Sequence, residues 1–286
     1  MTPDEAKAQL DQNVREIINW HFSPETGCPF WLEWAGKNFD PRKEIKCYED
    51  IVTKFPRFED EWLRDLQPDV WVPAAFKGKA YNIFETGGTT GMQKQRIGWN
   101  DFRVDYEEFS HKLDDKHFPP GVAWIMVGPT GPRSLRLAVE HLANYRGSSC
   151  YFIDLDPRFV KKLIGNRQFD VVRQYMEHVV DQAVMILYHR KIACLFTTPK
   201  LLEAIGEKIN VYVTGISGCF CGGTTTTTSN VRLPWKTLEN QWFTLRRTIS
   251  QLRAKWFHHC GCLQVGHFAS PNSLLAYVAQ PVPFAF

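Results

Sequence analysis

The order of apolar and amphipathic segments predicts an α/β protein with a largely parallel sheet flanked by helices. Short continuous apolar runs, of the length of buried strands, alternate with longer segments whose apolar residues have helical spacing. Most of these runs end in glycine, proline or aspartate, which favour turns. Residues 122–127 are the clearest such run, and the further strands are predicted at 150–153, 193–196 and 216–221. Because ligands of such sheets bind at the carboxyl ends of the strands, we expect the binding residues there.

The N-terminal segment, residues 1–78, is predicted to be helical and rich in aromatic residues. Thr2, Pro3 and Glu5 have the spacing of a capping box with proline in the first turn, followed by apolar residues at helical spacing as far as Ile18. Residues 21–72 then break into short pieces rich in tryptophan, phenylalanine and proline, with one helix expected at 58–66. Such aromatic density favours packing beneath loops over a cofactor site.

A glycine-rich and threonine-rich loop follows the strand predicted at residues 81–84. Within ten residues it contains three glycines, three threonines and one lysine. Glycine lets backbone N–H groups turn toward an anion, hydroxyl groups add donors, and lysine adds a compact positive charge. The loop therefore predicts phosphate binding, although a threonine-rich surface turn is the alternative. The candidate phosphate-binding residues are Thr86, Gly87, Gly88, Thr89, Thr90, Gly91 and Lys94.

The spacing of the glycine, threonine and lysine residues in this loop distinguishes among the known kinds of phosphate-binding loop. It lacks the Gly-Lys pair of a Walker A loop and the G-x-G-x-x-G pattern of a dinucleotide site. It does resemble T-[SG]-G-T-T-G-x-P-K, the signature of the adenylate-forming superfamily (AMP-dependent synthetases and ligases), except that Gln93 replaces the proline. The Thr86-Gly87-Gly88 variant looks most like the branch of phenylacetate-CoA ligases and acyl-protein synthetases. The resemblance implies that the loop holds the β- and γ-phosphates of ATP, with Mg²⁺ accompanying the nucleotide.

The segments after the loop continue in strand and helix order. Helices are expected at 135–145, around 171–186 and at 199–208, the last with proline at its start. Asp154 and Asp156 end a strand, where an Asp-Pro turn is favoured over a catalytic carboxylate pair. The histidines at 141 and 178 are interpreted as ordinary helix residues.

A second match to the superfamily ends the last predicted strand. Gly222, Gly223 and Thr224 resemble the Gly-Gly-[ET] segment that lies against the adenine of ATP, although an ordinary turn explains such a pair equally well in isolation. The turn at residues 128–132 resembles the substrate-side turn of these enzymes, although a tight turn before a helix explains it equally well. Together the matches imply an ATP-binding adenylation core at 79–224, and a partial adenylate-forming N-terminal domain overall.

Residues 225–286 form an atypical tail. They contain six basic residues and one acidic residue, Glu239, so the tail carries +5 whereas residues 1–224 carry −2. The family's Y-G-x-T-E-like segment, its ribose-binding aspartate and its mobile domain with a catalytic lysine have no counterpart here. The tail is therefore predicted to be frameshifted or disordered. A basic aromatic nucleic-acid surface around Arg246 and Arg247, and a zinc site around His258 and Cys260, are the alternatives.

The composition is that of a globular protein without a membrane span. The 286 residues, 44% of them hydrophobic, suffice for a globular core, and the eight scattered cysteines read mostly as buried thiols. No run of roughly 18 apolar residues and no signal peptide is recognised, so we expect a cytoplasmic protein with no membrane partner.

The expected function is ATP-dependent activation of a carboxylic acid as an acyl adenylate. The partners implied are a small-molecule acid and a CoA or acyl-carrier acceptor, and a nucleic acid is not expected. Because the family features after Thr224 are missing, we expect a truncated chain with weak or no turnover. The alternative is a non-catalytic partner or scaffold protein with the adenylation fold.

Overall fold

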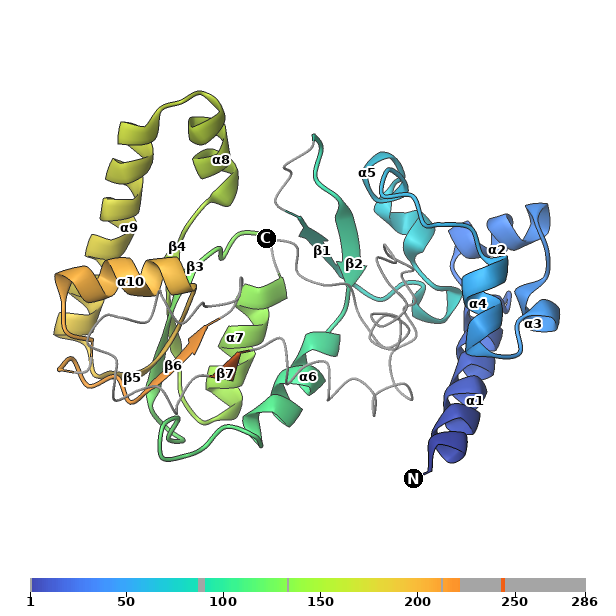
Figure 1. Ribbon diagram of the computed structural model, residues 1–286, viewed down its shortest axis with the longest axis horizontal. Coiled ribbons are helices and arrows are strands. Elements are labelled where there is room, and N and C mark those ends of the chain that lie inside the picture. Colours follow the sequence, from blue (N-terminus) through green and yellow to red (C-terminus); the bar gives the residue numbers. More distant parts are fainter. Residues whose placement is uncertain (1, 87–90, 133, 212, 222–242, 245–286) are drawn as a thin grey trace. The chain divides into compact units, whose positions relative to one another are not determined.

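The computed structural model describes residues 2–86, 91–132, 134–211 and 213–221, and the backbone of residues 243 and 244. The described residues form two compact units (Figure 1). The first is built from residues 2–84 and 92–99, and the second from residues 85, 86 and 91 and those from 100 onward. No helix in this part of the chain combines the length and the apolarity needed to cross a membrane.

The first unit consists of short helices and a two-stranded sheet. Its N-terminal helix confirms the predicted capping box, because the Thr2 hydroxyl accepts from the Glu5 N–H and the Glu5 carboxylate accepts from the Thr2 N–H. β1 and β2 pair with each other. The elements are α1 (Pro3–His21), α2 (Pro29–Lys37), α3 (Pro41–Glu44), α4 (Tyr48–Lys54), α5 (Trp62–Asp65), the 3₁₀ turns η1 (Pro68–Trp71) and η2 (Ala74–Phe76), β1 (Asn82–Glu85) and β2 (Gln95–Gly98).

An aromatic core holds the first unit together. The rings of Trp34 and Phe55 stack with their centroids 5.1 Å apart, and those of Phe30 and Trp71 lie 4.3 Å apart. This arrangement confirms that the aromatic residues serve packing. The helix predicted at 58–66 is shorter in the structure, because Phe58 enters this core from non-helical backbone and Gln67, which precedes a proline, is extended.

The second unit confirms the predicted α/β fold with a parallel sheet. The strands are ordered β4-β3-β5-β6-β7, and every neighbouring pair is parallel. They are β3 (Ala123–Gly128), β4 (Cys150–Asp154), β5 (Ile192–Thr197), β6 (Gly218–Cys221) and β7 (Phe243–Thr244). The helices are α6 (Asp101–Ser110), α7 (Ser134–Tyr145), α8 (Pro157–Gly165), α9 (Phe169–His189) and α10 (Pro199–Lys208).

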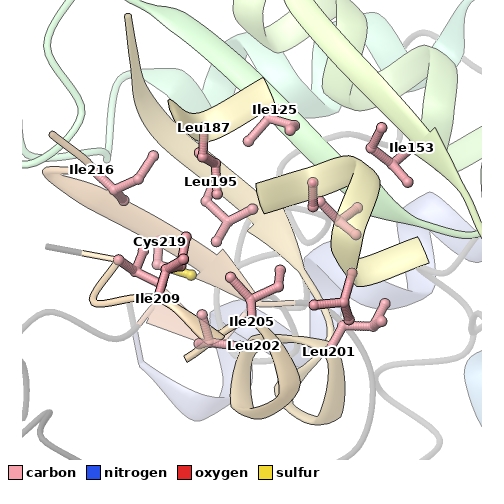
Figure 2. Packing of buried hydrophobic residues seen from close by; sticks show 14 of the residues in the cluster. Ile125, Ile153, Leu187, Leu195, Leu201, Leu202, Ile205, Ile209, Ile216 and Cys219 are labelled. Atoms are coloured by element: carbon pink, nitrogen blue, oxygen red, sulfur yellow. The ribbon is translucent and has the colours of Figure 1, made fainter. Parts of the chain in front are cut away.

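Helices cover both faces of this sheet because successive strand residues point to opposite sides. Trp124 and Met126 of β3 pack in one core with residues of α6 and α7. Ile125 and Val127 pack in the other core with residues of α9 and α10 (Figure 2). The central strands are therefore buried on both sides, which explains their continuous apolar sequence.

β2 and α6 are among the elements that were not expected from the sequence. β2 has only one strongly apolar residue, Ile97, in four, which gives no strand signal. In α6 the signal existed, because Phe102, Tyr106 and Phe109 have helical spacing and all belong to the core beside α7.

Candidate functional site

The strand order of the second unit defines where a ligand is expected. β4 and β5 lie on opposite sides of β3, and the helices that follow β3 and β5, α7 and α10, cover opposite faces of the sheet. The carboxyl ends of β3 and β5 thus form a topological switch point, the place where open α/β sheets bind ligands.

Polar bonds connect the strand ends at this switch point. The N–H and hydroxyl groups of Thr130, in the turn after β3, donate to Asp154 Oδ1 at 2.9 and 2.7 Å. The buried hydroxyl of Thr197, at the end of β5, donates to the Val127 carbonyl oxygen at 2.8 Å. These bonds fix the turn at residues 128–132, for which the sequence left open a substrate-side turn or an ordinary tight turn before a helix.

The two aspartates near this edge have structural roles. Asp154 holds the turn after β3, as described above, and the Asp156 carboxylate accepts from the Arg158 N–H at 2.8 Å and caps α8. The interpretation of this pair as part of a turn, and not as a catalytic pair, is consistent with these contacts.

The beginning of the phosphate loop is attached to the same edge. The Glu85 N–H, at the end of β1, donates to the Pro132 carbonyl oxygen at 2.8 Å. The Glu85 carboxylate forms an ion pair with the guanidinium of Arg158, in the first turn of α8. Since Thr86 follows directly, this anchoring brings the start of the loop to the turn after β3. No sequence pattern indicates a pairing between residues 73 positions apart.

The end of the loop is held within the first unit. The Met92 carbonyl oxygen accepts from Arg64 Nε at 3.1 Å, and Lys94 forms an ion pair with Asp60, with both side chains about one-quarter exposed. Gly91 has a φ of +125°, a conformation that residues with a Cβ rarely adopt. The structure thus holds Thr86 in the second unit and Lys94 in the first, each with partners of its own.

The remaining predicted site residues lie outside the described residues. They are Gly87, Gly88, Thr89 and Thr90 of the loop and Gly222, Gly223 and Thr224 of the adenine motif, together with most of the tail. β6 ends at Cys221, one residue before Gly222, and Cys221 pairs in register with Thr197.

Three thiols within the strands of the sheet are unsuited to nucleophilic attack. A hydrogen bond with Cys221 and burial raise the pKa of Cys219, and burial raises the pKa values of Cys150 and Cys194 to about 12. These thiols therefore remain protonated at neutral pH, and thiolate is the reactive form.

A cluster with the composition of a metal site occurs elsewhere among the described residues. Asp11, Cys47 and Glu49 lie close together on α1 and at the start of α4. However, Lys7 Nζ already pairs with the carboxylates of Asp11 and Glu49, at 3.2 and 3.0 Å. Both carboxylates of this cluster therefore already have a cationic partner within the first unit.

The fold is that of part of an adenylate-forming ligase. The solved structures similar to this chain include an open conformation of 2-hydroxyisobutyryl-CoA ligase in complex with 2-HIB-AMP and CoA, with a TM-score of 0.53 and 13% identity over 85% of this chain and 54% of that one. The same ligase in the postadenylation state has a TM-score of 0.51 and 16% identity, and the match covers 78% of this chain and 44% of that one. At these identities the likeness establishes the fold, and the chain spans about half the length of these ligases.

The sequence comparisons add no family assignment. No protein-family model and no curated protein matches this chain. The predicted branch, that of phenylacetate-CoA ligases, therefore stays a prediction.

Proposed function

We propose that this chain carries the ATP-binding portion of an AMP-forming carboxylate ligase. In the proposed reaction a carboxylate oxygen of the acid attacks the α-phosphorus of ATP, the bond to the β-phosphate oxygen breaks, and acyl adenylate and pyrophosphate form. The observation that carries the proposal is the attachment of Glu85 to Pro132 and Arg158, since it leads a loop with the superfamily signature to the switch point of an adenylate-forming fold.

The residues have distinct proposed roles in this reaction. Thr86, Thr89, Thr90, the N–H groups of the loop glycines and Lys94 would orient and neutralise the β- and γ-phosphates, which places the α-phosphorus in line with the acid. Gly222, Gly223 and Thr224 would lie against the adenine. Mg²⁺ would be carried by the phosphate oxygens, its usual ligands in nucleotide sites, since the Glu85 carboxylate already pairs with Arg158.

The first test is equilibrium binding of ATP to the wild type and to Lys94→Ala. Removing a charge-assisted bond to phosphate should weaken ATP binding by roughly 10- to 100-fold. Lys77→Ala removes an exposed lysine of the same unit and should leave the affinity unchanged. Equal affinity of the wild type and Lys94→Ala would contradict the role of the loop.

A second variant separates phosphate binding from structural damage. Asp60→Asn removes the negative charge that faces Lys94 but keeps the lysine. If Lys94 binds phosphate, this variant should bind ATP at least as tightly as the wild type. If both variants weaken binding equally, the ion pair only supports the loop, and the proposed role of Lys94 is wrong.

We also propose that turnover is weak or absent in this chain. The support is that residues 225–286 contain a single acidic residue, Glu239, and no counterpart of the family's Y-G-x-T-E-like segment. ATP–pyrophosphate exchange over a panel of aryl and fatty acids measures this directly, and robust exchange would overturn the proposal. The same observations favour a second candidate, a scaffold subunit with the adenylation fold, which predicts a stable protein complex and no exchange.

A further inference from the structure

The helical hairpin of α8 and α9 exposes apolar side chains where the two helices join. Ile164, in the last turn of α8, is 48% exposed, and Phe169, the first residue of α9, is 62% exposed. Figure 1 shows the turn between the helices at the end of the hairpin remote from α10. We call residues 162–169 the hairpin tip.

Contacts between the two helices support this tip. Leu163 is buried, and the ring of Phe159 contacts that of Tyr175 edge-on, with the centroids 5.5 Å apart. The backbone N–H groups of Asn166, Arg167 and Gln168 bond to carbonyl oxygens of the last turn of α8. Ile164 and Phe169 are therefore presented to solvent on a structured turn.

The charge of the same segment has one sign. Residues 157–169 contain no acidic residue and four basic residues. The basic residues are Arg158, Lys161, Lys162 and Arg167. Arg158 is neutralised by Glu85, and Asp170, just beyond the tip, pairs with Arg173. Lys162 and Arg167, both exposed, lie on the tip itself beside the apolar side chains.

We propose that the hairpin tip docks on the surface of an anionic phospholipid bilayer. Basic residues would contact the headgroups while Ile164 and Phe169 insert at the boundary of the acyl chains, as in peripheral anchors. A bilayer fits better than an acidic protein, because a stable protein interface needs about 800 Å² from each partner, more than a single turn with two apolar side chains presents. The proposal revises the expectation of no membrane partner, and it does not depend on ATP binding.

Co-sedimentation of the full chain with vesicles tests the proposal. Vesicles of phosphatidylcholine with about 30% phosphatidylglycerol should bind the protein, and vesicles of phosphatidylcholine alone should not. Binding should decrease in about 0.5 M NaCl, since salt screens the headgroup charge. Absence of binding to the anionic vesicles, or equal binding to both kinds, would overturn the proposal.

Matched variants locate the contact. The double variant Ile164→Ser with Phe169→Ser should weaken vesicle binding at least tenfold. Its control is Met185→Ser with Tyr188→Ser, which removes two residues of similar exposure, 62% and 65%, from the opposite end of α9 and should bind like the wild type. A charge variant, Lys162→Gln with Arg167→Gln, should weaken binding by roughly fivefold per basic residue.

Three outcomes of this comparison contradict the proposal. One is wild-type binding by the Ile164 and Phe169 variant, and another is an equal loss in the Met185 and Tyr188 control. The third is that light scattering shows a dimer of the wild type and a monomer of the Ile164 and Phe169 variant. A second copy of the chain would then cover the tip. Since all of these positions are exposed, unchanged thermal unfolding should accompany every variant.

Discussion

Single residues in this protein combine structural and proposed functional roles, and Lys94 is the clearest case. The sequence assigned it to phosphate by its place in a motif. The structure adds a largely buried ion pair with Asp60, a residue 34 positions earlier. No local sequence pattern predicts such a partner, because an ion pair between distant residues depends on how the chain folds.

His21 gives a prediction at the same scale. It ends α1 and is only 4% exposed, and burial lowers its pKa from 6.5 to about 3. The unfolded chain therefore binds a proton below about pH 6.5 that the folded chain does not. The free energy of unfolding should fall as the pH decreases from there, by about 2 kcal/mol between about pH 7 and pH 5.

Urea unfolding at the two pH values measures this effect. His21→Gln should lose this part of the pH dependence, whatever its stability at neutral pH. His178→Gln, on the exposed side of α9, should keep the wild-type dependence. If His21→Gln and the wild type show the same change with pH, burial of His21 is not its cause.

At the scale of elements, most boundaries follow from local chemistry. α10 spans the predicted residues, because Thr198 caps it and Pro199 begins it. β6 is shorter than predicted and begins at Gly218. Ser217, just before it, donates through its N–H to the Ala193 carbonyl oxygen at 2.8 Å and through its hydroxyl to the His117 carbonyl oxygen at 3.0 Å. A contact with residues 100 positions away is not visible in a strand pattern.

Gly218 gives the prediction for this scale. A Cβ atom there would lie 2.3 Å from the His117 carbonyl oxygen and 2.7 Å from the Phe118 ring. Gly218→Ala should therefore destabilise the second unit by about 1–3 kcal/mol or more, through displacement of the strand or of the residue 117–118 backbone.

The control for this substitution is another glycine. Gly36, in α2, has open space around its Cβ position. Gly36→Ala should stabilise the protein by roughly 0.5–1 kcal/mol, because alanine favours the helix. Thermal or denaturant unfolding of both variants gives the comparison, and equal stability of Gly218→Ala and the wild type would mean that the close approach is absent in solution.

At the scale of the molecule, the parallel sheet couples two cores. Because β3 and β5 contribute alternate residues to both, loss of packing on one face weakens the strands that support the other. Leu195→Ala, in the core beside α9 and α10, should cost about 2–5 kcal/mol. Met185→Ala, at an exposed position of α9, should change stability by less than about 0.5 kcal/mol.

Hydrogen exchange tests the coupling itself. In Leu195→Ala, amides of α7, on the opposite face, should lose protection together with those of α9, as in one cooperative unit. Protection that decreases in α9 and stays unchanged in α7 would show that the two cores open separately.

The sequence by itself determined the α/β class, the capped N-terminal helix, the order of the parallel strands along the chain and the loop with the superfamily signature. These features depend on short-range periodicity, capping and turn chemistry. Tertiary structure alone decided that Glu85 bonds to Pro132 and Arg158, that Lys94 pairs with Asp60, and that the turn of the α8–α9 hairpin exposes Ile164 and Phe169. The physical reason is that partners and exposure are set when distant segments pack, and packing depends on the whole chain.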